Sequence, residues 1–135
     1  MINYKLFIWI SLTFIAVSCD YEGDEYYYIN NKTNLDIKVS FVKKYGNDKK
    51  DTTKISVLSN ETRNFYTYKT IAALTKQKGE NYLDVFDTLW ISINDTLTLN
   101  KDLYKIDNWD YSHQGSRDVE NKYTFMINNN DIRTR

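Results

Sequence analysis

The stretch Leu35-Asp36-Ile37-Lys38-Val39-Ser40-Phe41 alternates apolar and polar side chains without interruption. Because successive side chains of a β-strand point to opposite faces, this pattern predicts a strand with one buried face and one wet face. The same alternation of aliphatic or aromatic residues returns at residues 89–93 and 123–127. No window longer than a dozen residues has the spacing of an amphipathic helix.

Short alternating runs separated by polar turns recur along the chain, which is typical of a two-layer β-sandwich. In the run 62–68, Phe65 is predicted to face one side and Tyr66 and Tyr68 the other. The chain has 135 residues, enough for one domain. We therefore expect an all-β fold, a single antiparallel, immunoglobulin-like β-sandwich over residues 26–135. About seven strands are predicted, at residues 26–29, 35–41, 55–57, 62–68, 89–93, 97–99 and 123–127.

The aliphatic residues between positions 89 and 99 all have odd numbers. If Ile93 pairs with Leu97 across a three-residue loop, all these odd-numbered aliphatic side chains lie on one face of the sheet. The shared odd numbering therefore predicts a hairpin at this place. Trp90 then lies on the other face and needs a cover, for which Trp109 is the candidate.

The N-terminal residues have the pattern of a secretion signal. Residues 6–17 form a mostly apolar run after Lys5, shorter than the ~20 residues that a membrane-spanning helix needs. The run ends in Ala16-Val17-Ser18-Cys19, and small residues before the single cysteine resemble a bacterial lipobox. We expect residues 1–18 to be a cleaved lipoprotein signal peptide and Cys19 to be lipidated. An ordinary cleavable signal is the alternative.

Residues 19–25 are predicted to be the lipidated cysteine and a short acidic tether, because four of the six residues after Cys19 are acidic. Acyl chains on Cys19 would hold the protein on the membrane without a transmembrane helix. The acidic stretch resembles the patch that directs Bacteroidota lipoproteins to the cell surface. An ordinary polar linker is the alternative.

Three segments carry a family resemblance: residues 87–95 (DTLWISIND), 123–127 (YTFMI) and 128–132 (NNNDI). They are similar to the C-terminal half of small uncharacterised Bacteroidota lipoproteins. The resemblance implies a compact β-sandwich on a lipid anchor at the outer membrane, facing the cell surface or the periplasm. It implies no assigned activity.

Composition and motifs exclude several functions. The 18 Lys and Arg residues balance 18 Asp and Glu residues, which argues against nucleic acid as a partner. One cysteine excludes an internal disulfide, and one histidine excludes a multi-histidine metal site. No nucleophile elbow, phosphate-binding glycine loop or zinc-protease motif occurs. We therefore expect no enzymatic activity and no cofactor, and we assign no residue as a metal ligand; calcium binding by acidic loops stays open.

Two binding hypotheses remain. Trp109, Tyr111 and His113 alternate, so one face of an extended segment would offer aromatic rings to a ligand such as a sugar, unless Trp109 only covers Trp90. Oxygen ligands for calcium are available at Asp102, Asp107, Asn108 and Asp110, although their spacing is not that of an EF-hand.

The sequence thus predicts a surface-displayed binding module that contacts a glycan or another envelope protein, with the membrane as its second partner through Cys19. The alternative is a periplasm-facing structural or accessory lipoprotein that has no ligand of its own.

Overall fold

The computed structural model describes residues 23–45, 51–70, 82–115 and 119–135. The predicted signal peptide and Cys19 lie outside these residues. The described part is all-β, with two short 3₁₀ turns, η2 (Ile106–Asn108) and η3 (Asn129–Asp131), and it contains no helix long and apolar enough to cross a membrane. Its strands are β1 (Gly23–Asn31), β2 (Ile37–Lys43), β3 (Thr53–Val57), β4 (Thr62–Thr70), β5 (Phe86–Ser92), β6 (Leu97–Leu99), β7 (Trp109–Gln114), β8 (Val119–Ile127) and β9 (Ile132–Thr134).

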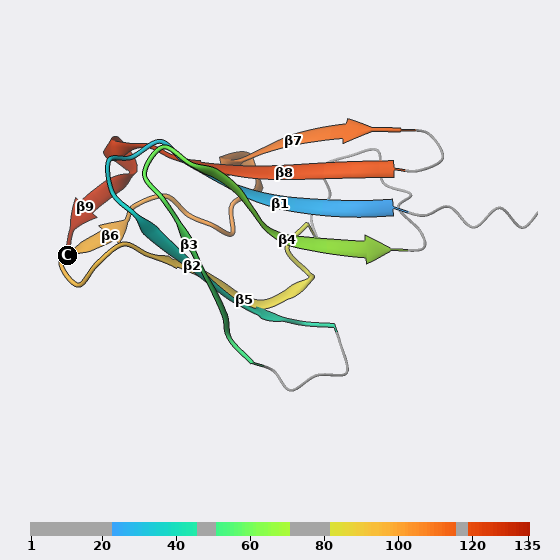
Figure 1. Ribbon diagram of the computed structural model, residues 1–135, viewed down its shortest axis with the longest axis horizontal. Coiled ribbons are helices and arrows are strands. Elements are labelled where there is room, and N and C mark those ends of the chain that lie inside the picture. Colours follow the sequence, from blue (N-terminus) through green and yellow to red (C-terminus); the bar gives the residue numbers. More distant parts are fainter. Residues whose placement is uncertain (1–22, 46–50, 71–81, 116–118) are drawn as a thin grey trace, which may run out of the picture.

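The strands form three sheets (Figure 1). Sheet A has the order β4-β1-β8-β7, sheet B the order β3-β2-β5, and sheet C pairs β6 with β9. Sheet A extends to the right in Figure 1, sheet B lies below it, and sheet C lies at the left beside the C-terminus.

The prediction of an antiparallel fold with about seven strands needs correction. β1 and β8 pair in parallel, which alternation cannot reveal because it carries no information on strand direction. The described part also contains two strands that were not predicted, β7 and β9, because β7 is mostly polar and β9 is only three residues long. β1 already begins at Gly23, so residues 23–25 belong to the first strand and not to the tether.

The predicted hairpin between residues 93 and 97 is wrong. β5 pairs with β2, whereas β6 pairs with β9. The Asn94 side chain explains the separation, because its Oδ1 accepts hydrogen bonds from the backbone N–H groups of Thr96 (3.0 Å) and Leu97 (2.8 Å). Such an Asx turn redirects the chain before a hairpin can form.

A β-bulge in β4 makes the predicted placement of Phe65 and Tyr66 on opposite faces wrong. Tyr27 pairs with Tyr66 and Tyr28 with Asn64, so Phe65 is the extra residue between two paired positions. A bulge turns neighbouring side chains to the same face. Phe65 and Tyr66 therefore both contact Phe41 of β2, with ring centroids 5.6 and 5.5 Å apart.

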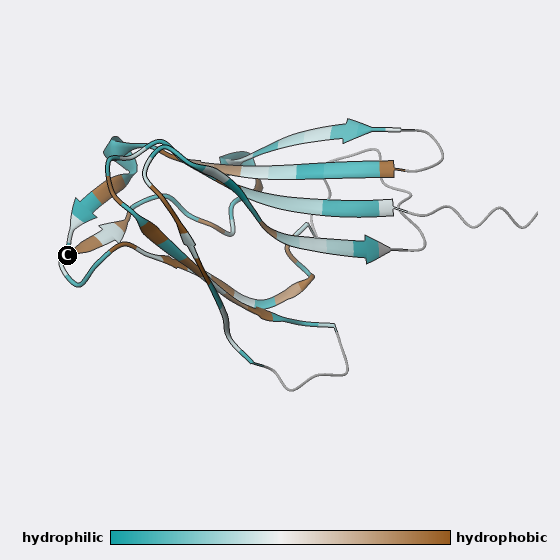
Figure 2. Cartoon of the chain, in the orientation of Figure 1, coloured by the Kyte–Doolittle hydropathy of each residue, from teal (hydrophilic) through white to brown (hydrophobic). Residues whose placement is uncertain are grey.

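The core lies between the inner faces of sheets A and B. The alternation in β2 is confirmed at Ile37 and Val39, which are fully buried, and at Lys38, which is exposed. Ser40 departs from it, because it faces outward but is buried between its register neighbours Lys54 and Trp90. Much of sheet B is brown in Figure 2, whereas the strands of sheet A are mostly white to teal. Sheet A is pale because its strands are rich in tyrosine and polar residues. The tyrosine and polar residues on its inner face form the candidate site.

Candidate ligand-binding site

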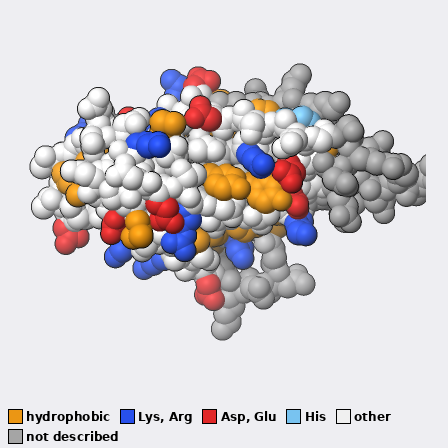
Figure 3. Space-filling model, turned by 45° about the horizontal axis from the view of Figure 1, so that its top comes forward, with side chains coloured by type: hydrophobic (Ala, Val, Ile, Leu, Met, Phe, Trp, Pro, Cys, Tyr) orange, Lys and Arg blue, Asp and Glu red, His pale blue; other side chains and the backbone are white. Residues whose placement is uncertain are grey.

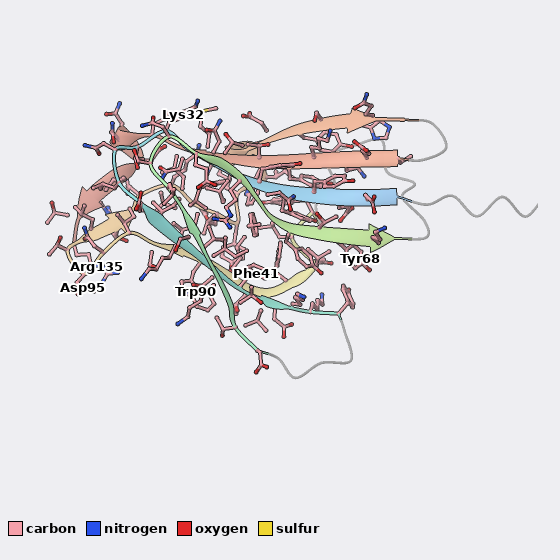
Figure 4. All side chains as sticks on the ribbon, in the orientation of Figure 1. Lys32, Phe41, Tyr68, Trp90, Asp95 and Arg135 are labelled. Atoms are coloured by element: carbon pink, nitrogen blue, oxygen red, sulfur yellow. The ribbon has the colours of Figure 1, made fainter. Side chains whose placement is uncertain are left out.

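The inner face of sheet A is built of transverse rows of side chains, which follow from the strand register. Along the strands, an apolar row is followed by a row of tyrosines and then by a polar row. The polar row is unusual, because the interior of a β-sandwich is ordinarily apolar. In Figure 4 the labelled Tyr68 marks the end of sheet A where the polar row lies. The three rows are Ile29, Phe125 and Trp109; Tyr66, Tyr27, Tyr123 and Tyr111; and Tyr68, Glu25, Asn121 and His113.

Asn121 is the centre of the polar row and is fully buried. Its Oδ1 accepts a hydrogen bond from the Tyr111 hydroxyl (2.8 Å) and lies 2.9 Å from His113 Nδ1. Because Oδ1 can only accept, Nδ1 must carry the ring proton, and Nε2 of the neutral imidazole is then an acceptor. Asn121 Nδ2 and His113 Nε2 are buried, and neither has a hydrogen-bond partner in the part of the chain that the structure describes.

Asn31 shows that this fold can satisfy a buried asparagine on the same face. It is also fully buried, yet its Nδ2 donates to the carbonyl oxygens of Leu35 (2.8 Å) and Leu58 (2.9 Å). Its Oδ1 accepts from the Thr33 backbone N–H (3.1 Å) and hydroxyl (2.7 Å). A buried donor without a partner costs about 1–3 kcal/mol, so the unpaired amide of Asn121 requires an explanation that Asn31 does not.

Glu25, the register partner of Asn121, is half-buried, and its carboxyl group accepts a hydrogen bond from Tyr27. The Tyr27 hydroxyl lies 2.6 Å from the Tyr82 carbonyl oxygen and 3.0 Å from Glu25 Oε2. The hydroxyl has one proton and the carbonyl can only accept, so the shorter bond uses that proton. The longer contact, in which the same hydroxyl donates to Glu25 Oε2, therefore stabilises the Glu25 carboxylate only weakly.

Burial favours the neutral form of the Glu25 carboxyl group. Burial raises the pKa of Glu25, and the contact with Tyr27 offsets only part of the rise. Burial likewise raises the pKa of the tyrosines around it, that of Tyr82 to about 12 and that of Tyr111 and Tyr123 above the ordinary value. The whole inner region therefore disfavours charge.

The outer face of sheet A carries the charged residues instead. The Tyr26 ring lies 6.5 Å from that of Tyr28 and 5.9 Å below the Lys122 ammonium group. The Tyr26 hydroxyl donates to Asp24 (3.2 Å), and Lys122 pairs with Glu120 (3.1 Å). In Figure 3 the visible face has orange side chains near its centre, with blue and red side chains beside them.

Trp109 does not belong to a binding face, so this part of the predicted site is wrong. It is only 1% exposed, its Nε1 donates to the Leu103 carbonyl oxygen (2.7 Å), and its ring packs on Phe125 at 5.2 Å. It does not cover Trp90 either, since Trp90 is 41% exposed on the opposite sheet. Tyr111 and His113 do share its face, and the structure brings both to Asn121.

Sequence reasoning missed Asn121 and Glu25. A signal for Asn121 was present, because it is the one polar residue among the inward positions 119, 121, 123, 125 and 127. Glu25 was hidden in the predicted tether. The calcium hypothesis finds no support, because no group of three or more His, Cys, Asp or Glu side chains within the described ranges could hold a metal ion. Asp102 instead accepts from the Tyr104 backbone N–H (2.8 Å).

Comparison with protein-family models, with curated proteins and with solved structures gave no match.

Replacing Glu25 with glutamine should remove a pH dependence of stability. The folded protein holds the Glu25 proton to higher pH than the unfolded chain, whose glutamate titrates near pH ~4.3. The free energy of unfolding of the wild type should therefore fall as the pH rises above that value, until the folded state also loses the proton. Glutamine mimics the protonated carboxyl group. The Glu25→Gln variant should therefore be more stable than the wild type at pH 7, whereas the two proteins should have the same free energy of unfolding at low pH. Urea midpoints across this range test the prediction.

Glu120→Gln, on the outer face of the neighbouring strand, is the control and should keep the wild-type profile. A Glu25→Gln variant that is less stable than the wild type at pH 7 would contradict the raised pKa of Glu25.

Proposed function

We propose that this chain is a lipid-anchored protein of a bacterial envelope that displays its β-domain at the outer-membrane surface as a binding module. The support for the anchor is the apolar run that ends in Ala16-Val17-Ser18-Cys19. The proposal takes the domain as an immunoglobulin-like β-sandwich of the kind found in small Bacteroidota lipoproteins. Two sheets that share one core, and the resemblance of residues 87–95 and 123–132, support that view.

The observation that carries the binding function is that two of the three buried, unpartnered polar atoms in the described residues, Asn121 Nδ2 and His113 Nε2, lie in one row of sheet A; the third is Asn30 Oδ1. A domain without a ligand gains nothing from this arrangement, because Asn31 shows that full pairing is attainable in the same fold. Glu25 and His113 are each half-buried, so the polar row reaches the surface of the domain. Its partner would be a glycan or another envelope protein, and the proposal assigns no catalysis.

Replacing Cys19 with alanine should abolish membrane attachment. The wild-type chain should incorporate radiolabelled palmitate and sediment with membranes, whereas Cys19→Ala should do neither because no other cysteine exists. Ser18→Ala keeps a small residue before the cysteine and should stay lipidated. Label that still enters the Cys19→Ala variant would overturn the anchor.

Display at the surface is tested by protease treatment of intact cells. Loss of the domain from wild-type cells supports a surface-displayed module. Full protection, with digestion only after the outer membrane is opened, would favour the periplasm-facing accessory protein instead.

A further inference from the structure

We propose that the polar row of Glu25, Asn121 and His113 binds a neutral, hydroxyl-rich group, the chemistry of a sugar unit. The proposal rests on the binding function proposed above and names the ligand class for that site.

The charge of the row excludes ionic ligands. The fourth member of the row is Tyr68, so the described row contains no Lys or Arg. Lys122, which follows Asn121 in β8, points to the outer face, where it lies over the Tyr26 ring. A phosphate, sulfate or carboxylate group would therefore enter without a counter-charge, next to a carboxyl group. A metal ion would lack ligands as well, because Asn121 Oδ1 already accepts two hydrogen bonds.

The hydrogen-bonding capacity left in the row is mixed. Asn121 Nδ2 can only donate, and His113 Nε2 of the neutral ring, with Nδ1 committed to Asn121, can only accept. A hydroxyl group is both a donor and an acceptor, so adjacent hydroxyls satisfy both atoms at once. The Glu25 carboxyl group adds a second group that accepts hydrogen bonds and, in the neutral form that burial favours, also donates one. The Tyr111 ring beside them supplies apolar surface for the carbon face of a sugar.

The place of the row in the chain suggests where such a ligand would be met. The segment from Cys19 to Gly23 can span at most about 14 Å when fully extended. Glu25 follows two residues later in β1. If Cys19 is acylated, the row lies in the half of the domain nearest the anchor, within reach of sugars on lipid headgroups. Free saccharides have the same hydroxyl chemistry, so the experiment must separate the two sources.

The test follows the Asn121 side-chain amide by NMR in the full lipidated chain, held in phosphatidylethanolamine nanodiscs. The probes are glucose, galactose, mannose and N-acetylglucosamine at pH 7.5, with glucuronate and the neutral dipeptide Gly-Gly as comparisons. A second set of nanodiscs contains a monogalactosyl lipid. We expect the Asn121 amide signals to shift with a neutral sugar, free or as a headgroup, and not with glucuronate or the dipeptide. The source is identified by whether the signals shift with the free sugars or with the nanodiscs that contain the galactosyl lipid.

Two variants link the shift to the row. His113→Phe removes the acceptor at a half-buried position and should weaken sugar affinity at least tenfold, whereas Ser112→Ala on the exposed face of the same strand should leave it unchanged. Urea midpoints establish that both variants fold. If His113→Phe does not fold, His113→Leu, which also lacks an acceptor, provides the same comparison with a smaller side chain.

The outcomes separate this inference from the proposed function. No shift with any neutral sugar in either form, or a shift only with glucuronate or the dipeptide, would overturn the ligand class. An anchored and protease-accessible chain would still support the displayed module in that case. Sugar binding by a chain that is protected in intact cells would overturn surface display and leave the ligand class standing.

Discussion

Ile37→Asp should unfold the domain. Ile37 is fully buried on β2, the central strand of sheet B, where it is in register with Val57 of β3. A carboxylate placed there has no partner, and burying it costs several kcal/mol against a total stability of about 5–15 kcal/mol for a small domain. We expect loss of the cooperative urea transition and of the β-sheet circular dichroism signal at neutral pH.

Lys38→Asp is the matched control, because Lys38 is adjacent in the chain but exposed on the outer face. Its urea midpoint should stay close to that of the wild type. Ile91→Asp should be intermediate, since Ile91 lies on the edge strand β5 and is only half-buried. Equal tolerance of aspartate at positions 37 and 38 would show that β2 is not a half-buried strand.

Alternation predicted the strands well where one face packs on the core and the other meets water. It failed where local hydrogen bonds or distant pairing decide the path of the chain. Asn94 ends the run of β5 with a side-chain turn, and the bulge at Phe65 breaks the period of two, so parity assigned both places wrongly. The parallel pairing of β1 with β8 joins residues about a hundred positions apart, which no local pattern encodes.

The candidate site was predictable only in part, for the same reason. Tyr111 and His113 were placed on one face because they lie two residues apart on a strand. Their common partner Asn121 follows from the register of β7 against β8, and the link to Glu25 follows from the register of β1 against β8. Trp109 was assigned to the same surface because it alternates with Tyr111 and His113, although its burial depends on residues that pack across the sheet.

Trp109→Ala should cause a large loss of stability. The Trp109 ring is fully enclosed by Phe125, Tyr82 and Tyr27, whose ring centroids lie 5.2 to 6.5 Å away, and its indole N–H donates to the Leu103 carbonyl oxygen. Truncation of a buried tryptophan costs about 3–5 kcal/mol, because it removes apolar contacts and leaves a cavity. The Leu103 carbonyl group would also lose its donor. A large fall in the urea midpoint is the expected result.

Trp90→Ala is the control, since this tryptophan is 41% exposed on the outer face of sheet B and should cost far less. The comparison separates burial from residue type, because both variants lose the same indole ring. A Trp109→Ala variant as stable as Trp90→Ala would mean that Trp109 is not enclosed by the core. The ring would then be accessible on the side of β7 where Tyr111 and His113 lie, and the aromatic binding face predicted from the sequence would have to be reinstated.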